Sequence, residues 1–140
     1  MTEPVQITIR ALQHVGIPVS DIEASGRFYE RLGFRNVMRR PFLHGGEEGT
    51  CIMMKRGEVT IELYQLPQKE LEGIRQRKDG HIDHIAFDVP DIEATFHTLK
   101  SSGFSIIEDA PVTLDFWERG CRYFNIIGPD NERLEFNQIL

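Results

Sequence analysis

The stretch from His14 to Phe34 reads HVGIPVSDIEASGRFYERLGF, and the stretch from His84 to Phe104 reads HIAFDVPDIEATFHTLKSSGF. With a shift of 70 positions and no gap, 8 of the 21 residues are identical. Downstream, IELYQ at 61–65 corresponds to LEFNQ at 134–138 with a shift of 73. Self-similarity of this kind indicates a repeated structural unit. The chain is therefore predicted to contain two related modules, each opening with a histidine and closing with a glutamate.

Each copy begins with the alternation of a half-buried strand. In the first copy Val15, Ile17 and Val19 fall on one face, and His14 falls on the other. The sequence SDIE at 20–23 has the S-x-x-E form of a capping box headed by Ser20, so a helix is predicted to follow it and to end near Gly33. The second copy predicts a corresponding helix that ends near Gly103.

The remaining strands are predicted from short apolar or alternating runs. They are expected at residues 34–38, 51–54 and 59–66 in the first module, and at 104–108, 121–127 and 133–139 in the second. Residues 44–49 are rich in glycine and predict a loop. The order β-α-β-β-β then occurs twice, which indicates the α+β fold class. We expect a single domain over 1–140, with module one at about 9–66, a linker with one possible helical turn at about 67–80, and module two at about 81–140.

Composition excludes several classes of partner. The formal net charge of −6 argues against a protein that binds nucleic acid, because such binding needs clustered Lys and Arg. No apolar run approaches the length of a membrane span, and the N-terminus lacks the pattern of a signal peptide. Cys51 and Cys121 are expected to be reduced and packed. We therefore expect a cytoplasmic protein with neither a nucleic-acid nor a membrane partner.

Strand periodicity places four ligand-type side chains on one side of the predicted sheet. If the large aliphatic residues face the helices, His14 and His84 lie on the opposite, concave face. The same alternation in the closing strands places Glu62 and Glu135 on that face. A pseudo-twofold relation between the modules would bring the four side chains together.

A divalent metal ion would explain this set. Burying two carboxylates side by side without a cation costs free energy, because like charges in a medium of low dielectric cannot both stay ionised. Two imidazoles and two carboxylates suit one Zn, Ni, Mn, Fe or Co ion, and the lack of thiolate ligands argues against a structural zinc site. The alternative is that each histidine and glutamate has only a local role, but four repeat-matched positions favour the metal.

Four further residues are candidate substrate-binding residues. Tyr64 and Asn137 share the concave face with the expected ligands. Trp117 and Glu118 lie in an irregular stretch that has no counterpart in the first module. This stretch is either a wall of the substrate pocket or a hydrophobic plug or dimer contact.

The sequence resembles the vicinal oxygen chelate superfamily, which includes glyoxalase I, methylmalonyl-CoA epimerase, the fosfomycin and bleomycin resistance proteins and the extradiol dioxygenases. The resemblance rests on the openings HVGIPVSD and HIAFDVPD, the helix ends LGF and SGF, and the closing GPDNERLEF. It implies two βαβββ modules that form an incomplete, mostly antiparallel barrel around a metal site, commonly in a homodimer. It also implies that His14, Glu62, His84 and Glu135 are the metal ligands.

Within this superfamily the residues favour proton transfer. Because Glu62 is kept as a fourth ligand-type residue, the pattern resembles glyoxalase I, a lyase or isomerase that works through a metal-stabilised enediolate. Glu135 is the first choice for the catalytic base and Glu62 the second. Pro18 stands where bacterial glyoxalase I usually has Arg, which favours a small hydroxycarbonyl substrate other than a glutathione adduct.

Three alternatives remain within the superfamily. An epimerase typically has Gln at the position of Glu62. A bleomycin-resistance-type protein sequesters its ligand without catalysis, and such proteins characteristically lose the metal ligands. A fosfomycin-modifying enzyme usually lacks the glutamate of the first module.

Overall fold

Both copies of the repeat fold as a strand followed by a helix, as the alternation of apolar residues predicts. The structure is a computed structural model of the chain and describes residues 3–77, 80, 82–129 and 133–140. By their internal contacts the residues form two compact units. We call residues 14–83 the His14 unit, and residues 1–13 together with 84–140 the His84 unit.

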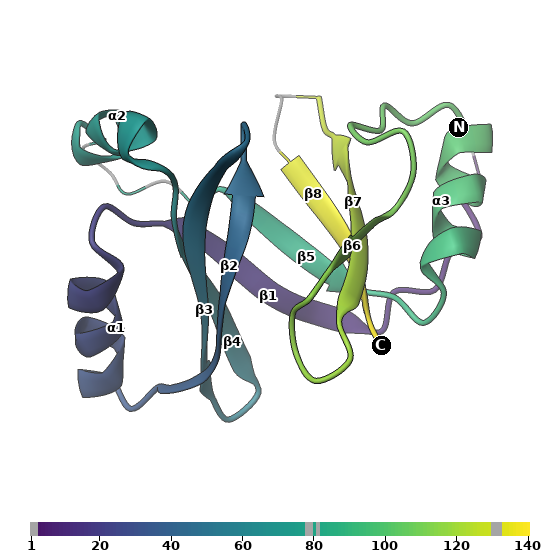
Figure 1. Cartoon of the computed structure of the whole chain (residues 1–140). Helices are drawn as coiled ribbons and strands as arrows, with labels where there is room; N and C mark the ends of the chain where they lie inside the picture. The colour runs from purple at the N-terminus through teal and green to yellow at the C-terminus, as the bar shows by residue number, and fades with distance from the viewer. Residues whose placement is uncertain (1–2, 78–79, 81, 130–132) are drawn as a thin grey trace. The chain divides into compact units, whose positions relative to one another are not determined.

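The His14 unit is a four-stranded layer with one helix on its face (Figure 1). Its strands follow the order β2-β3-β4-β1, with β1 parallel to β4 and the other neighbours antiparallel. Its elements are β1 (Ala11–Pro18, from His14 onward in this unit), α1 (Ile22–Arg31), β2 (Arg35–His44), β3 (Glu47–Arg56), β4 (Val59–Gln65), a short 3-10 turn (Gln68–Glu70) and α2 (Leu71–Arg75).

The His84 unit repeats this plan. Its strands follow the order β5-β8-β7-β6, again with one parallel pair, β5 with β8, and antiparallel neighbours elsewhere. Its elements are β5 (His84–Asp88), α3 (Ile92–Ser101), β6 (Val112–Leu114), β7 (Cys121–Ile127) and β8 (Arg133–Ile139). The α+β class and the paired βαβββ plan are therefore confirmed.

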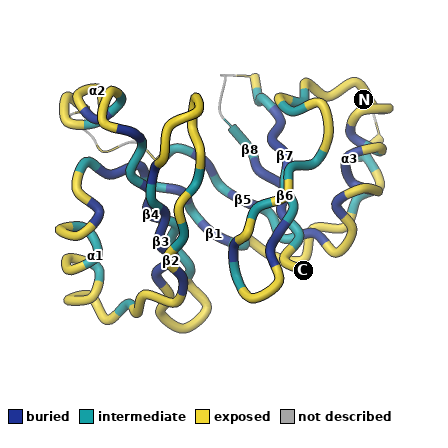
Figure 2. The backbone as a smooth tube through the Cα atoms, viewed as in Figure 1, coloured by how far each residue is buried: buried dark blue, intermediate teal, exposed yellow. Residues whose placement is uncertain are grey.

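Buried residues lie on the strands and on the helix of each unit (Figure 2), and apolar side chains from both form its core. In the His84 unit Phe124 is fully buried between Phe96, which meets its ring edge-on, and Phe136, which stacks on it. In the His14 unit Leu63 and Met54 are fully buried in the corresponding layer. The predicted helix-facing side of the strands is confirmed, and it leaves the other face of each layer for the histidines and glutamates.

The start of α1 differs from the predicted capping box, and α3 begins in the same way as α1. The N-cap is Asp21 rather than Ser20, and its Oδ1 accepts a hydrogen bond from the backbone N–H of Ala24 at 3.0 Å. Asp91 does the same for Ala94 in α3, also at 3.0 Å. An aspartate one residue further along takes the capping role, because its extended backbone directs the carboxylate at the third N–H of the helix.

Glutamines from the closing strands complete both helix starts. Gln65 Oε1 accepts from the N–H of Ile22 at 2.8 Å, and Gln138 Oε1 accepts from the N–H of Ile92 at 2.9 Å. Two of the donors that a helix start leaves without intrahelical partners are thus satisfied in each unit.

Asp21→Ala is expected to lower the free energy of unfolding by about 1 kcal/mol, because it removes the acceptor for Ala24 N–H. Urea denaturation measures this change. Ser20→Ala is the matched control, expected to cost less than about 0.5 kcal/mol. A larger loss in Ser20→Ala than in Asp21→Ala would restore the capping box headed by Ser20.

Two strand predictions were wrong. Residues 44–49 do not form a loop, since β2 and β3 continue to a two-residue turn at Gly45 and Gly46, which have φ values of 59° and 79°. A tight hairpin turn needs such positive φ values, and glycine adopts them without strain. In the second module residues 104–108 form no strand, and Ile106 makes only an isolated bridge to Ile126. The strand at the edge of that layer is β6 instead.

The expected helical turn in the linker and the expected packing of the two cysteines agree with the structure. The predicted linker carries the short helix α2. Cys51 and Cys121 are buried as reduced thiols. Among the helices in the described part of the chain, none is both long and apolar enough to cross a membrane.

Candidate metal centre

The first histidine and glutamate form a pair within the His14 unit. In the register of β1 and β4, Gly16 lies opposite Glu62, while Val15 and Ile17 lie opposite the helix-facing Ile61 and Leu63. This alternation puts His14 and Glu62 on the face away from α1. His14 Nε2 lies 3.8 Å from Glu62 Oε2, with the imidazole almost fully buried and the carboxylate mostly so.

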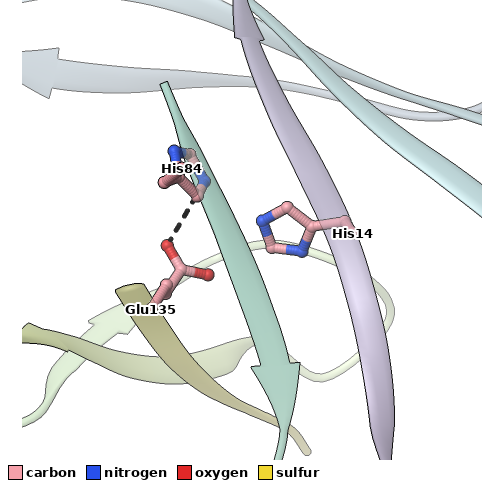
Figure 3. A group of neighbouring side chains, drawn as sticks. All are labelled: His14, His84 and Glu135. Carbon is pink, nitrogen blue, oxygen red and sulfur yellow. Dashed lines mark ion pairs between the residues drawn. The ribbon is translucent and has the colours of Figure 1, made fainter. Parts of the chain in front are cut away.

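The second pair occupies the corresponding place in the His84 unit. Ala86 lies opposite Glu135 in the register of β5 and β8. His84 Nε2 lies 3.6 Å from Glu135 Oε1, and both side chains are buried. Figure 3 marks this ion pair with a dashed line.

Hydrogen bonds hold Glu135 in place within the His84 unit. Asn137 Nδ2 donates to Glu135 Oε2 at 3.0 Å, and Asn137 Oδ1 accepts from Gln13 Nε2 at 3.1 Å. Gln13 also donates to Asp88, whose other oxygen binds Arg10 at 2.6 Å. One oxygen of Glu135 is thus engaged by an amide while the other is directed toward His84.

The donor set fits a divalent ion. The His–Glu distances of 3.6 and 3.8 Å exceed those of a hydrogen bond. They are close to the roughly 3–3.5 Å that separates two neighbouring ligands when each lies about 2.0–2.2 Å from the same metal. His14 is 2% exposed in its unit, and His84 and Glu135 are 7% and 8% exposed in theirs, so each unit buries metal-ligand donors. Imidazole and carboxylate ligands suit Zn, Ni, Mn, Fe and Co.

The exposed histidines differ from these two. His97 Nε2 lies 3.9 Å from Glu93 Oε2, a distance similar to those of the buried pairs, but His97 is 74% exposed. His44 pairs with Glu70 at 3.8 Å and is also solvent-accessible. Water can solvate both exposed pairs, whereas the two buried pairs bear a larger cost of desolvation.

The predicted substrate-binding residues lie in different settings. Tyr64 is buried two residues beyond Glu62 on the same face of β4, and its ring meets Phe42 edge-on at 6.2 Å. Phe42 lies opposite Gly49, where a Cβ would come within 2.6 Å of the phenyl ring, so glycine there makes room for this aromatic pair. Asn137 contacts Glu135 directly.

Trp117 and Glu118 lie in the turn between β6 and β7. Glu118 is exposed and Trp117 is half-buried. Trp117 has a φ of 65°, in the left-handed region that side chains other than glycine rarely adopt. Backbone strain of this kind is concentrated at functional sites. The substrate-binding role of both residues stays a prediction.

Asn125 is a further polar residue near Glu135 that was not predicted from the sequence. It lies in β7 directly opposite Glu135 in the register of β7 and β8, and it is buried. Its backbone N–H and side-chain amide both donate to Glu108, at 2.6 and 2.9 Å. A polar residue inside the apolar run YFNII was the available signal.

The sequence model of the glyoxalase/bleomycin resistance protein/dioxygenase superfamily matches residues 11–136. The chain belongs to this superfamily. A Bacillus subtilis (strain 168) superfamily relative, the uncharacterized protein YwbC, is 35% identical over 131 residues, which cover 92% of this chain and 98% of that protein.

Two solved structures show the same fold as this superfamily member. A hypothetical protein, BH1468 from Bacillus halodurans C-125, is 25% identical with a TM-score of 0.72, and the match covers 93% of this chain and 94% of that one. Methylmalonyl-CoA epimerase from Mycobacterium tuberculosis is 19% identical with a TM-score of 0.74, covering 100% of this chain and 93% of that one.

Asn137→Leu is expected to weaken binding of a divalent metal by about 10- to 100-fold, because Glu135 loses the amide that fixes its Oε2. Titration of the metal-free protein with Zn²⁺ or Ni²⁺ measures this change. Gln138→Leu is the matched control, since its amide binds the start of α3 and not Glu135. Equal metal affinity in both variants would show that Asn137 does not position the carboxylate.

Proposed function

We propose that the protein is a metal-dependent enzyme that transfers a proton within a small hydroxycarbonyl substrate, as a lyase or isomerase of the glyoxalase-I type. The observation that carries this proposal is the pair of buried His–Glu couples, one in each unit at repeat-matched positions. Buried carboxylates beside imidazoles are costly as structural features alone, because each ion pair must offset its own desolvation.

In this proposal one divalent ion, Zn, Ni, Mn, Fe or Co, is bound by His14, Glu62, His84 and Glu135. Each unit supplies one imidazole and one carboxylate. The ion, when bound, supplies polarisation of two neighbouring oxygens of the substrate. A set without thiolate is typical of a site that keeps positions open for substrate rather than of a closed structural site.

Glu135 is the proposed catalytic base. Its carboxylate takes the proton from the hydroxyl-bearing carbon next to the carbonyl, and the electron pair of that C–H bond moves toward the carbonyl oxygen. The carboxylate then returns the proton to the former carbonyl carbon, while the hydroxyl proton passes to the former carbonyl oxygen, so that the first carbon becomes the new carbonyl. The bond from Asn137 to Oε2 orients the group and leaves Oε1 for the reaction. Glu62 is the second candidate, because the repeat gives it an equivalent place on β4.

Tyr64, Asn137, Trp117 and Glu118 are proposed to contact the substrate. For Tyr64 the support is its buried place beside Glu62, and for Trp117 it is the strained backbone. We also propose that the protein acts as a homodimer in the cytoplasm.

Epimerisation is the second candidate, supported by the fold shared with methylmalonyl-CoA epimerase. It uses the same elementary step, removal and return of a proton beside a carbonyl. The two candidates differ in substrate, so a proton-exchange experiment separates them.

The experiment begins with metal analysis of the purified protein, which is expected to find about one divalent ion per chain. The metal-loaded protein is then incubated in D₂O with hydroxyacetone, dihydroxyacetone or methylmalonyl-CoA, and loss of the proton beside the carbonyl is followed by NMR. Exchange in the hydroxyketones supports the leading proposal, and exchange only in methylmalonyl-CoA supports the epimerase. No exchange, with stoichiometric binding of bleomycin, would instead indicate a sequestering protein.

A further inference from the structure

Asn125 in β7 donates two hydrogen bonds to the carboxylate of Glu108. Glu108 Oε1 accepts from its backbone N–H, and Glu108 Oε2 accepts from its side-chain Nδ2. The flanking backbone bonds run from Ile107 N to Asn125 O at 2.9 Å and from Ile127 N to Ser105 O at 3.0 Å. The Glu108 carboxylate therefore takes the place of a backbone acceptor for the N–H of Asn125, and it also binds the side-chain amide.

These two hydrogen bonds fix the orientation of the Asn125 side-chain amide. An ionised carboxylate only accepts hydrogen bonds, so the NH₂ group of Asn125 must face Glu108. The carbonyl oxygen Oδ1 is then the atom of the amide that points away from Glu108. Exchanging the two ends of the amide would place two hydrogen-bond acceptors, Oδ1 and the carboxylate, against each other.

The Oδ1 atom is a buried acceptor in need of a donor. Asn125 is 5% exposed, and within the described residues its Oδ1 accepts no hydrogen bond. Most buried side-chain polar atoms in proteins have a partner, because an unpaired one keeps the full cost of its desolvation. A buried acceptor held in a fixed orientation is a preorganised place for an external hydroxyl or amine.

The position of Asn125 beside Glu135 indicates that the donor to Oδ1 is a group of the substrate. Asn125 and Glu135 are directly opposite each other on neighbouring antiparallel strands, so their side chains leave the same face of the layer with Cβ atoms roughly 4.5–5.5 Å apart. The reacting carbon of the substrate would lie at the Glu135 carboxylate. A further substituent on the β7 side of that carbon would then lie over Asn125.

We propose that Asn125 Oδ1 accepts a hydrogen bond from a hydroxyl of the substrate, and that the substrate is a hydroxycarbonyl compound with at least one hydroxyl beyond the two oxygens that face the metal. This inference rests on the proposed function and narrows its substrate class to polyhydroxylated compounds. Asn125 acts as a specificity-determining residue, because an analogue without the hydroxyl leaves the buried oxygen unpaired.

The test compares dihydroxyacetone with hydroxyacetone, in which a methyl group replaces one CH₂OH group. Binding to the metal-loaded protein is measured by ligand-observed NMR, without turnover. The wild-type protein is expected to bind dihydroxyacetone about tenfold more tightly, as one hydrogen bond to a buried group allows. In Asn125→Leu and Asn125→Ala this ratio is expected to fall to about one, with the affinity for hydroxyacetone unchanged.

Controls separate this role from a structural one. Glu108 is half-buried, so water can reach its carboxylate once Asn125 is replaced. Ile126→Val is the control, because Ile126 lies on the helix-facing side of the same strand. This variant is expected to keep the tenfold preference for dihydroxyacetone over hydroxyacetone. Loss of affinity for both ketones to the same extent, or an unchanged ratio in the Asn125 variants, overturns the role of Asn125 alone. Failure of the wild-type protein to bind either ketone overturns the proposed function and the role of Asn125 with it.

Discussion

Glu135→Gln is expected to slow proton exchange in the substrate by about 10²- to 10⁴-fold when metal is saturating, because the amide cannot take up the proton. The substitution keeps the size of the side chain and one carbonyl oxygen for the bond from Asn137. Exchange of the proton beside the carbonyl in D₂O, followed by NMR at several metal concentrations, measures this effect. Saturating metal matters, since the variant also loses a charged ligand.

Glu62→Gln is the matched variant, because Glu62 occupies the equivalent position on β4 beside His14. If Glu135 is the base, Glu62→Gln weakens metal binding but keeps most of the exchange rate at saturating metal. If Glu62→Gln instead loses the exchange rate at saturating metal and Glu135→Gln keeps it, Glu62 is the base. Full metal content together with full exchange in both variants would end the proton-shuttle hypothesis.

Removing the metal is expected to destabilise the protein. At a free metal concentration 100 times the dissociation constant, binding stabilises the folded state by about 2.7 kcal/mol. For a chain of this size that corresponds to a fall in Tm of roughly 10 °C when a chelator strips the ion. Thermal unfolding followed by circular dichroism, with and without chelator, measures the shift.

The histidine variants show where the ion binds. His84→Ala and His14→Ala are each expected to lose most of the dependence of Tm on metal, because each removes a buried ligand. His97→Ala is the control, since it removes an exposed imidazole that lies at a similar distance from a glutamate. A metal-dependent Tm that survives in His14→Ala and His84→Ala but is lost in His97→Ala would place the ion on the surface of α3.

The sequence by itself determined the repeat, the α+β class and the sorting of residues between the two faces of each layer. These features depend on local periodicity, because alternate residues of a strand point to opposite sides wherever the strand is placed. For this reason the 21-residue and 5-residue matches could place His14, Glu62, His84 and Glu135 on the face away from the helices. The superfamily followed from the same residues.

Only the tertiary structure decided the details that depend on contacts between distant parts of the chain. Glu108 takes the place of a backbone partner for Asn125, 17 residues away, and Ile106 makes only an isolated bridge to β7. The amide of Gln13 reached Asn137, 124 residues away, and through it fixed the orientation of Glu135. Periodicity shows which face a side chain occupies but not which partner it meets there, because hydrogen bonds between distant residues are set by the packing of whole strands.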